Sequence, residues 1–420
     1  MFIVVIINSN TFGAEGTGTI ALFILGLTLL QVLSNFVGGS TLVFLTPQKN
    51  NFQILFLSYL WAIVSNIGGL LLLRTLHLIP EEYTWQLLIL TFVYSIYYIH
   101  ISIMQGKEDI KLFNGYQLSQ ALLLILSLAG AIFYCSKQHL PTTIDIYIYA
   151  FLFSYAVPTF ASCFYIGKRM GKPNFQGIGS LLIEMFKLGF WTQLANLTQL
   201  LTYRLNYYLI GGYLGRKPLG IYELGSKLSE AVWIFPKSMC LIQYARIANN
   251  QEKEYTKNLT LSMFKVVLLF SLIAILVLLL LPASFIAWIF GPDFINSKPV
   301  ICSLLPGIVF LACNSILSHY FAGYGKYWIN AIGSIIGLVV TAALGFLLIP
   351  KASSISTMLA LQIAGWISSA AYFASMIYTL ICFLKQTTAS LSDFLITDAD
   401  IRFAKELLTE KLHTLKSRKQ

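Results

Sequence analysis

The chain is poor in charge. Only 11% of its 420 residues are Asp, Glu, Lys or Arg, whereas 57% are hydrophobic, and the mean hydropathy is +0.74. Soluble domains carry roughly 25% charged residues, so a soluble fold would have to expose much of this apolar side-chain surface. Continuous apolar runs of about 20 residues, the length of a membrane-spanning helix, recur along nearly the whole sequence. Because the runs do not alternate between apolar and polar residues, they predict an all-α, polytopic membrane protein.

The chain also lacks the cysteine spacings of metal and redox sites. Its six cysteines form no Cys-x-x-Cys pair and have no histidine at ligand spacing. They are Cys135, Cys163, Cys240, Cys302, Cys313 and Cys382. Nearly all fall inside predicted spans, where we interpret them as small apolar packing residues. The sequence therefore predicts no metal site and no cofactor.

Long loops are missing as well. No loop is long enough for a folded domain, and the longest, 167–180, is basic and rich in glycine. Membrane glycosyltransferases and acyltransferases usually carry catalytic acids or histidines in sizeable loops. We therefore predict that the chain is not an enzyme and keep a membrane glycosyltransferase as a less favoured alternative. Glu81 and Glu82 form the only paired carboxylate in the predicted external loops, and we interpret them as part of a solvated loop.

Eleven full spans can be placed in the sequence. They lie at roughly 19–45, 52–73, 84–105, 112–135, 145–167, 183–213, 219–242, 261–282, 298–323, 328–349 and 356–384. The opening stretch MFIVVIINSN is apolar but too short to cross a membrane, and it lacks the basic region and cleavage site of a signal peptide. We interpret it as a shortened first helix, for which a start codon placed too far downstream is one explanation. The prediction is then about twelve helices.

Lysine and arginine are unevenly shared between the two sides of this topology. With the N-terminus in the cytoplasm, 17 of the 28 basic residues fall on the cytoplasmic side and 6 on the other. Cytoplasmic loops carry such an excess, so both termini are predicted to be cytoplasmic. The net charge of +11 therefore requires no nucleic acid as a partner. The basic tail has an apolar helical face, which predicts either a helix on anionic membrane lipids or a solubilising tail.

Two short stretches repeat at equivalent places. Gly13 and Gly18 of FGAEGTGTIAL match Gly215 and Gly220 of LGRKPLGIYEL at an offset of 202. A second match, at an offset of 219, pairs His100, Gly106 and Lys107 with His319, Gly325 and Lys326. The common order predicts a parallel duplication of six plus six spans. The predicted parts are an N-terminal lobe at 1–180, a C-terminal lobe at 181–384 and an amphipathic cytoplasmic tail at 385–420.

The two matched histidines have two interpretations. We favour structural residues near the membrane interface for both. The other interpretation is that they titrate in a proton-coupled cycle, since histidine is the side chain that changes charge near neutral pH.

The predicted span 219–242 carries four charges. Glu223, Lys227, Glu230 and Lys237 lie within about 80° of one another if each residue turns the helix by 100°. A charge at the bilayer centre costs from about 2.5 to well over 10 kcal/mol. The stripe is therefore predicted to face a protein interior or a water-filled cavity.

The preceding span, 183–213, has a polar face of its own. Gln193, Asn196, Arg204 and Tyr207 fall on one side of it, and a tight turn could direct both stripes into one cavity. The alternative is a set of interhelical salt bridges with no ligand, which seldom repay their desolvation. We favour a cavity. Three bases against two acids leave a positive surplus, and these eight polar residues are the predicted substrate-binding residues.

The stretch RLNYYLIGGYLGRKPLGIYELGSKLSEAVWIFPKSM resembles the seventh and eighth helices of Wzx-type polysaccharide flippases, members of the multidrug/oligosaccharidyl-lipid/polysaccharide exporter superfamily. The resemblance rests on the Leu-Gly-x4-Gly turn, Tyr222, the region of Lys227, and Pro236 before a basic exit. FGAEGTG resembles the first-half counterpart of the turn. Many relatives have an acid two residues after the arginine, where this chain has Asn206.

The resemblance implies two six-helix lobes around a central cavity that opens alternately to each side of the bacterial inner membrane. The implied cargo is an undecaprenyl-pyrophosphate-linked oligosaccharide of polysaccharide or O-antigen biosynthesis, moved from the cytoplasmic to the periplasmic leaflet. Arg204, Lys227 and Lys237 would bind the pyrophosphate, while Glu223 and Glu230 would limit its affinity. Coupled H+ or Na+ and a polysaccharide polymerase are the further partners implied.

Aromatic side chains such as Tyr207, Tyr208 and Trp233 would stack on sugar faces. The alternative transporter is an ion-coupled exporter of drugs or other small molecules from the same superfamily. A cation exporter would want a surplus of acids, which the two stripes lack.

Overall fold

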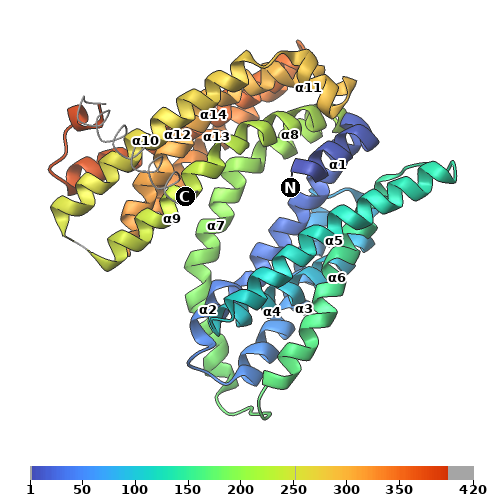
Figure 1. Cartoon of the computed structure of the whole chain (residues 1–420), viewed down its shortest axis with the longest axis vertical. Coiled ribbons are helices and arrows are strands. Elements are labelled where there is room, and N and C mark those ends of the chain that lie inside the picture. Colours follow the sequence, from blue (N-terminus) through green and yellow to red (C-terminus); the bar gives the residue numbers. More distant parts are fainter. Residues whose placement is uncertain (1, 251, 396–420) are drawn as a thin grey trace, which may run out of the picture. The chain divides into compact units, whose positions relative to one another are not determined.

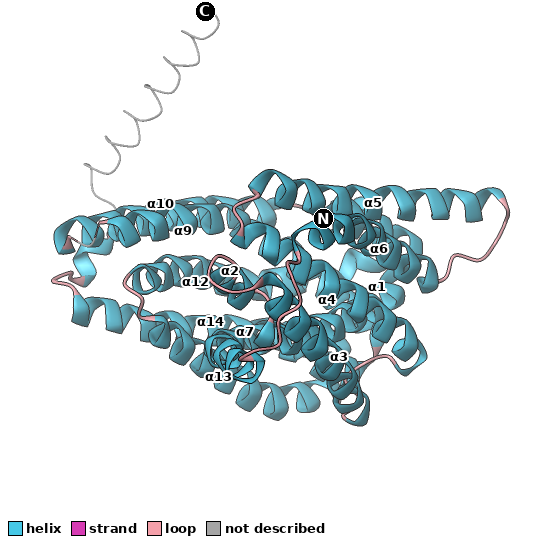
Figure 2. Ribbon diagram, turned by 90° about the horizontal axis from the view of Figure 1, so that it is seen from below, coloured by secondary structure: helices cyan, strands magenta, loops and turns pink. Residues whose placement is uncertain are grey.

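The computed structural model describes residues 2–250 and 252–395, and in these ranges it contains helices and turns but no β-strand (Figure 2). The α-helices are α1 (Phe2–Ser34), α2 (Ser40–Leu45), α3 (Asn51–Thr75), α4 (Thr84–Gly106), α5 (Ile110–Lys137), α6 (Ile144–Arg169), α7 (Ile178–Leu214), α8 (Arg216–Glu230), α9 (Ile234–Asn249), α10 (Lys253–Leu280), α11 (Ala283–Phe290), α12 (Ser297–Gly323), α13 (Tyr327–Ser353) and α14 (Thr357–Gln386) (Figure 1). Short 3-10 helices are η1 (Asn35–Val37), η2 (Glu81–Tyr83), η3 (Ala231–Trp233), η4 (Pro292–Asn296) and η5 (Leu391–Phe394).

The apolar runs form these helices because a helix satisfies its own backbone polar groups inside lipid. All eleven predicted spans fall on them, which confirms the all-α, polytopic membrane class. Nine segments in the described part of the chain are long and apolar enough to cross a membrane. The helices α7, α8 and α9 are not among them. These are the helices that carry the predicted charged and polar stripes.

The N-terminal stretch is helical but kinked. Helix α1 begins at Phe2, bends at Gly13, where φ is 62° and ψ is −165°, and then continues to Ser34. A positive φ of this kind favours glycine, which has no Cβ. The prediction of one helix over 19–45 is wrong, because η1 and Gly39, with φ of 52°, separate α1 from α2.

The prediction of one continuous helix over 219–242 is also wrong. The 3-10 turn η3 separates α8 from α9. Pro236 lies in the first turn of α9, where its missing N–H removes no helical hydrogen bond. Glu223, Lys227 and Glu230 share a face of α8 by helical periodicity, whereas Lys237 belongs to α9, so a single stripe of all four charges stays a prediction.

The chain forms two compact units. The first comprises Met1–Gly225, Pro282–Val300 and Ala342–Ala364, and the second comprises Ser226–Leu281, Ile301–Thr341 and Gly365–Gln420. The division falls inside α8. The predicted amphipathic tail lies, beyond residue 395, outside the described residues.

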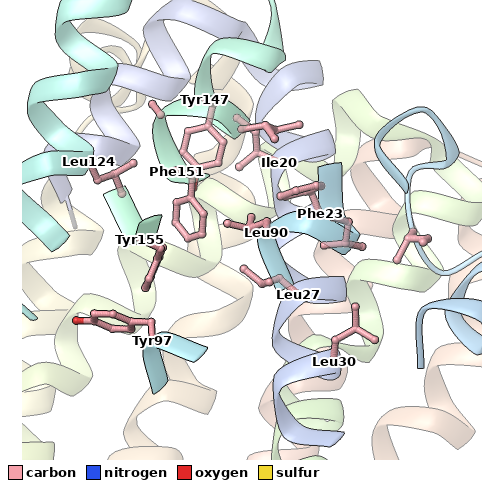
Figure 3. Close-up of a cluster of buried hydrophobic side chains, with 14 of the residues drawn as sticks. Ile20, Phe23, Leu27, Leu30, Leu90, Tyr97, Leu124, Tyr147, Phe151 and Tyr155 are labelled. Atoms are coloured by element: carbon pink, nitrogen blue, oxygen red, sulfur yellow. The ribbon is translucent and has the colours of Figure 1, made fainter. Parts of the chain in front are cut away.

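The first unit has an aromatic core among α1, α4, α5 and α6. Figure 3 shows Phe23 and Leu90 on one side of it and Tyr147, Phe151 and Tyr155 stacked above Tyr97. Tyr97 and Tyr155 meet edge to face, with ring centroids 5.1 Å apart. Helices in lipid associate through close packing rather than through the hydrophobic effect, so these large interlocking rings fix the positions of α4 and α6.

The second unit packs α9, α10, α12 and α14 around a separate core. Cys240, Phe264, Ile316, Tyr320 and Phe383 are among its buried residues. Cys240 and Cys313 are buried free thiols in this core, which confirms the packing interpretation for these two. Gly323 at the end of α12 packs closely against Ile247 of α9, so the two helices lie in contact in this core.

Candidate functional site

The two matched glycine motifs share one backbone conformation. Gly13 has φ of 62° and ψ of −165°, and Gly215, 202 residues later, has φ of 88° and ψ of −174°. Each glycine ends one helical stretch and starts the next. The two glycine motifs that match in the sequence therefore also have the same backbone conformation.

The two turns also pack against each other within the first unit. A Cβ added to Gly18 would collide with the carbonyl oxygen of Arg216, and a Cβ added to Gly220 would collide with that of Ala14. Ala14 and Arg216 are equivalent positions at the offset of 202, so the contacts are reciprocal. Only glycine permits this approach of two backbones, which explains why both motifs need it.

The second sequence match does not hold in the same way. Gly106 closes α4 and packs against the Val43 carbonyl and Thr46, whereas Gly325 is the left-handed residue, with φ of 71°, that follows α12. The left-handed residue after α4 is Glu108, with φ of 59°. The two glycines thus have different structural roles.

Two acidic residues that belong to neither motif bind the paired turns. Asp293 in η4 accepts a hydrogen bond from the Ala14 backbone N–H at 3.1 Å and pairs with the Lys217 ammonium at 3.1 Å. Glu82 in η2 pairs with the Arg216 guanidinium. The hydrogen bond to Glu82 raises the pKa of Arg216, so this guanidinium stays charged. We call these three contacts the crossed clamp, because Asp293 binds a residue of each motif and Glu82 binds the second motif.

The crossed clamp adds partners that the sequence did not single out. Glu81 and Glu82 are both exposed, as expected of a solvated segment, but Glu82 also pairs with Arg216 of α8, and Glu81 pairs with His77 at 2.9 Å. A pocket of about 370 Å³ opens beside Glu82 and Arg216. Glu82 and Asp293 each lie in a short turn just before a long helix, a position that is visible in the sequence. Their partners, however, lie far away in the chain.

Replacing Asp293 with alanine should lower the free energy of unfolding by about 1–2 kcal/mol, because it removes a cap from Ala14 and the partner of Lys217. Hydrogen exchange at the Ala14 amide should accelerate in the same variant. The matched control is Glu254→Ala, which removes an exposed acid paired with Lys257 at 2.9 Å and should cost much less, because solvent screens this pair. Equal losses in the two variants would contradict a special role for Asp293.

Arg204 on α7 lies among aromatic rings. Its guanidinium donates to the Tyr207 hydroxyl at 2.5 Å and lies 4.8 Å from the centre of that ring. Tyr207 is 2% exposed and meets Tyr222 of α8 edge to face at 5.8 Å. Tyr222 and Asn206 both donate to the Ala364 carbonyl, at 3.4 and 3.0 Å. A cation stacked on a ring in this way is oriented as well as charged.

The other predicted residues of α7 lie apart from Arg204. Gln193 is buried, and its side-chain oxygen accepts a hydrogen bond from Asn196 at 3.2 Å. The 11 residues from Gln193 to Arg204 correspond to roughly 16 Å along a helix. The predicted polar residues are therefore spread along the length of α7 and do not form one compact group.

The charged residues after α7 divide between the units. Glu223 lies in the first unit. Lys227 and Glu230 lie in the part of α8 that belongs to the second unit. Lys237 is exposed on α9, with its ammonium 4.2 Å from the centre of the Trp233 ring.

The fold is similar to solved membrane transporters. An inward-facing multidrug resistance MATE family transporter of the MOP superfamily aligns with a TM-score of 0.72 and 14% identity, over 92% of this chain and 95% of that one. The lipid II flippase MurJ, in an inward closed conformation, aligns with a TM-score of 0.73 and 14% identity, over 97% and 93%. A MOP superfamily transporter from Pyrococcus furiosus, whose binding pocket is described as having reverse polarity, aligns with a TM-score of 0.60 and 15% identity, over 91% and 94%.

No protein-family model matches the chain, and no curated protein matches it. At 12–16% identity, the structural matches establish the fold, which is that of MATE-like and MurJ-like transporters. They do not select a cargo. That selection depends on the chemistry of this chain's own side chains.

Proposed function

We propose that the chain is a flippase of the multidrug/oligosaccharidyl-lipid/polysaccharide exporter superfamily. Its cargo is an undecaprenyl-pyrophosphate-linked oligosaccharide, moved by alternating access from the cytoplasmic to the periplasmic leaflet of the bacterial inner membrane. The proposal includes the six-helix lobes 1–180 and 181–384, cytoplasmic termini, and H+ or Na+ as the coupling ion. It describes a transporter rather than an enzyme.

The observation that carries the proposal is the concentration of positive charge on the least apolar helices. Arg204, Lys227 and Lys237 lie on α7, α8 and α9, which are not among the nine described segments that are long and apolar enough to cross a membrane. A pyrophosphate head group needs cationic donors along an otherwise apolar path, and arginine binds phosphate oxygens in a fixed planar geometry. The Arg204 guanidinium is oriented for such a role by Tyr207.

Two acids on α8 would keep its cation from binding the cargo too tightly. Glu223 and Glu230 occupy the same helix as Lys227. A carrier must release its cargo at the far side, so an uncompensated row of cations would slow turnover. The acids thus suit a transporter of anions, whereas an exporter of cationic drugs would need more acids than bases.

The test is complementation of a host that lacks its flippase, with radiolabelled lipid-linked oligosaccharide followed on each leaflet. Wild type should move the label to the periplasmic leaflet and relieve cytoplasmic-side accumulation. Drug resistance without movement of the label would instead support the drug-exporter alternative. Appearance of a lipid carrier stripped of its sugar would support the glycosyltransferase alternative.

A further inference from the structure

His319 on α12 has one ring nitrogen engaged and one available. Its Nδ1 lies 2.8 Å from the carbonyl oxygen of Ser315. A carbonyl only accepts hydrogen bonds, so Nδ1 carries the hydrogen. Nε2 has no hydrogen-bond partner among the residues that the structure describes. The neutral ring therefore presents a lone pair at Nε2, which calls for a donor.

The sequence match of His319, His100, is arranged differently. Both of its ring nitrogens are engaged inside the first unit, Nε2 by the Tyr59 hydroxyl and Nδ1 by Ser162 Oγ, each at 2.6 Å. Ser162 donates its own hydroxyl hydrogen to the Thr159 carbonyl at 2.7 Å. His100 is thus saturated by protein groups and is structural, as the sequence indicated. The two histidines have different roles.

Ser315 joins His319 to a tryptophan and a lysine. The Trp233 indole N–H donates to Ser315 Oγ at 2.9 Å, and the Lys237 ammonium lies 4.2 Å from the centre of the Trp233 ring. We call Trp233, Lys237, Ser315 and His319 the His319 cluster. All four belong to the second unit, so a cation, an aromatic ring and a hydrogen-bond acceptor occur together on α9, η3 and α12.

Two further acceptors near the cluster have no donor. The side-chain oxygens of Asn314 and Asn330 are buried and accept no hydrogen bond in the described part of the chain. The Asn330 amide nitrogen donates to the Ser318 carbonyl at 2.9 Å, which fixes which end of that amide is the oxygen. Native proteins rarely leave buried polar atoms without partners. This end of α12 therefore has a surplus of acceptors.

We propose that the His319 cluster is a saccharide subsite of the cargo path. A sugar hydroxyl donates to His319 Nε2 and Trp233 offers an aromatic edge, while the Lys237 ammonium beside that ring stays available to the pyrophosphate of the same cargo. A sugar supplies the hydroxyl donors that the acceptors lack, whereas an ionised phosphate offers only acceptors. The subsite rests on the proposed function, because it assigns the glycan part of that cargo to the second unit.

The test uses the full chain in lipid nanodiscs and three probes. These are lipid-linked oligosaccharide extracted from a flippase-deleted host, the same oligosaccharide released from its lipid, and undecaprenyl pyrophosphate without sugar. His319→Ala should weaken binding of both sugar-bearing probes by about tenfold, the equivalent of one hydrogen bond. His319→Gln, whose amide oxygen can accept, should recover most of the loss. Neither variant should change binding of the bare pyrophosphate lipid.

Unchanged binding of the sugar-bearing probes by His319→Ala, at the unfolding temperature of wild type, would overturn the subsite. So would an equal loss of the bare pyrophosphate lipid, which would make the cluster an anion site. If wild type binds only the free oligosaccharide, and His319→Ala weakens it, the subsite stands and the proposed cargo fails. If wild type binds none of the probes, both fail.

Discussion

Gly220→Ala should destabilise the protein strongly, although it adds only one methyl group. The added Cβ would meet the carbonyl oxygen of Ala14, a backbone atom that cannot rotate away. Overpacking of a tight contact costs about 1–3 kcal/mol and sometimes more. The midpoint of thermal or denaturant-induced unfolding in detergent, followed by circular dichroism, measures the effect.

The matched control is Gly212→Ala on the adjoining helix α7. A Cβ there would meet no heavy atom within 4 Å, and alanine is favoured over glycine in a helix by about 1 kcal/mol. The free energies of unfolding of the two variants should therefore differ by roughly 2–4 kcal/mol. Equal stability would mean that the two turns are not in contact.

Gly18→Ala provides a second check on the reciprocal contact. It should resemble Gly220→Ala, because its Cβ meets the Arg216 carbonyl. The double variant should lose less than the sum of the two single losses, since either substitution alone already separates the same pair of turns. Strict additivity would indicate two independent packing defects.

Most helices could be predicted from the sequence, because a membrane span is recognised from the apolar residues of one short segment. Uninterrupted apolar runs located the eleven spans without any knowledge of their neighbours. The repeated glycines around Gly13 and Gly215 were also visible, because a positive φ requires a particular residue at a particular place. Both kinds of signal lie within a few neighbouring positions of the chain.

The parts of the site that depend on distant partners could not be predicted. Nothing near Asp293 in the sequence indicates that it caps the helix at Ala14, 279 residues away. Nor does periodicity reveal the break at η3, because three residues of tighter winding leave no mark in an apolar pattern. Lys237 lies beyond that break, on α9.

Some contacts of the site were nevertheless implicit in helical spacing. Arg204 and Tyr207 are three residues apart, and side chains at that spacing are neighbours on a helix. The different roles of His100 and His319 were not implicit, because they depend on what Ser162, Tyr59 and Ser315 contribute from other turns or helices. Identical residues at matched positions can thus have different roles.

Arg204→Ala should abolish transport, and Arg204→Lys should not fully restore it. Removing one partner of a desolvated charge interaction costs about 2–5 kcal/mol, which corresponds to roughly 30-fold to several thousand-fold in affinity. Lysine keeps the charge but lacks the planar guanidinium that stacks 4.8 Å from the Tyr207 ring centre. Binding of undecaprenyl pyrophosphate in nanodiscs and leaflet-resolved transport measure both effects.

Tyr207→Phe separates orientation from charge at the same place. It removes the hydroxyl that accepts from Arg204 at 2.5 Å but keeps the ring, so it should weaken pyrophosphate binding about fivefold, the equivalent of one hydrogen bond. The control is Arg246→Ala, which removes an equal charge from an exposed position near the end of α9 and should leave transport unchanged. Wild-type transport by Arg204→Ala would mean that this guanidinium only joins helices. If Arg204→Ala loses transport but Tyr207→Phe does not, the cargo is recognised by the positive charge of Arg204 rather than by the orientation that Tyr207 gives it.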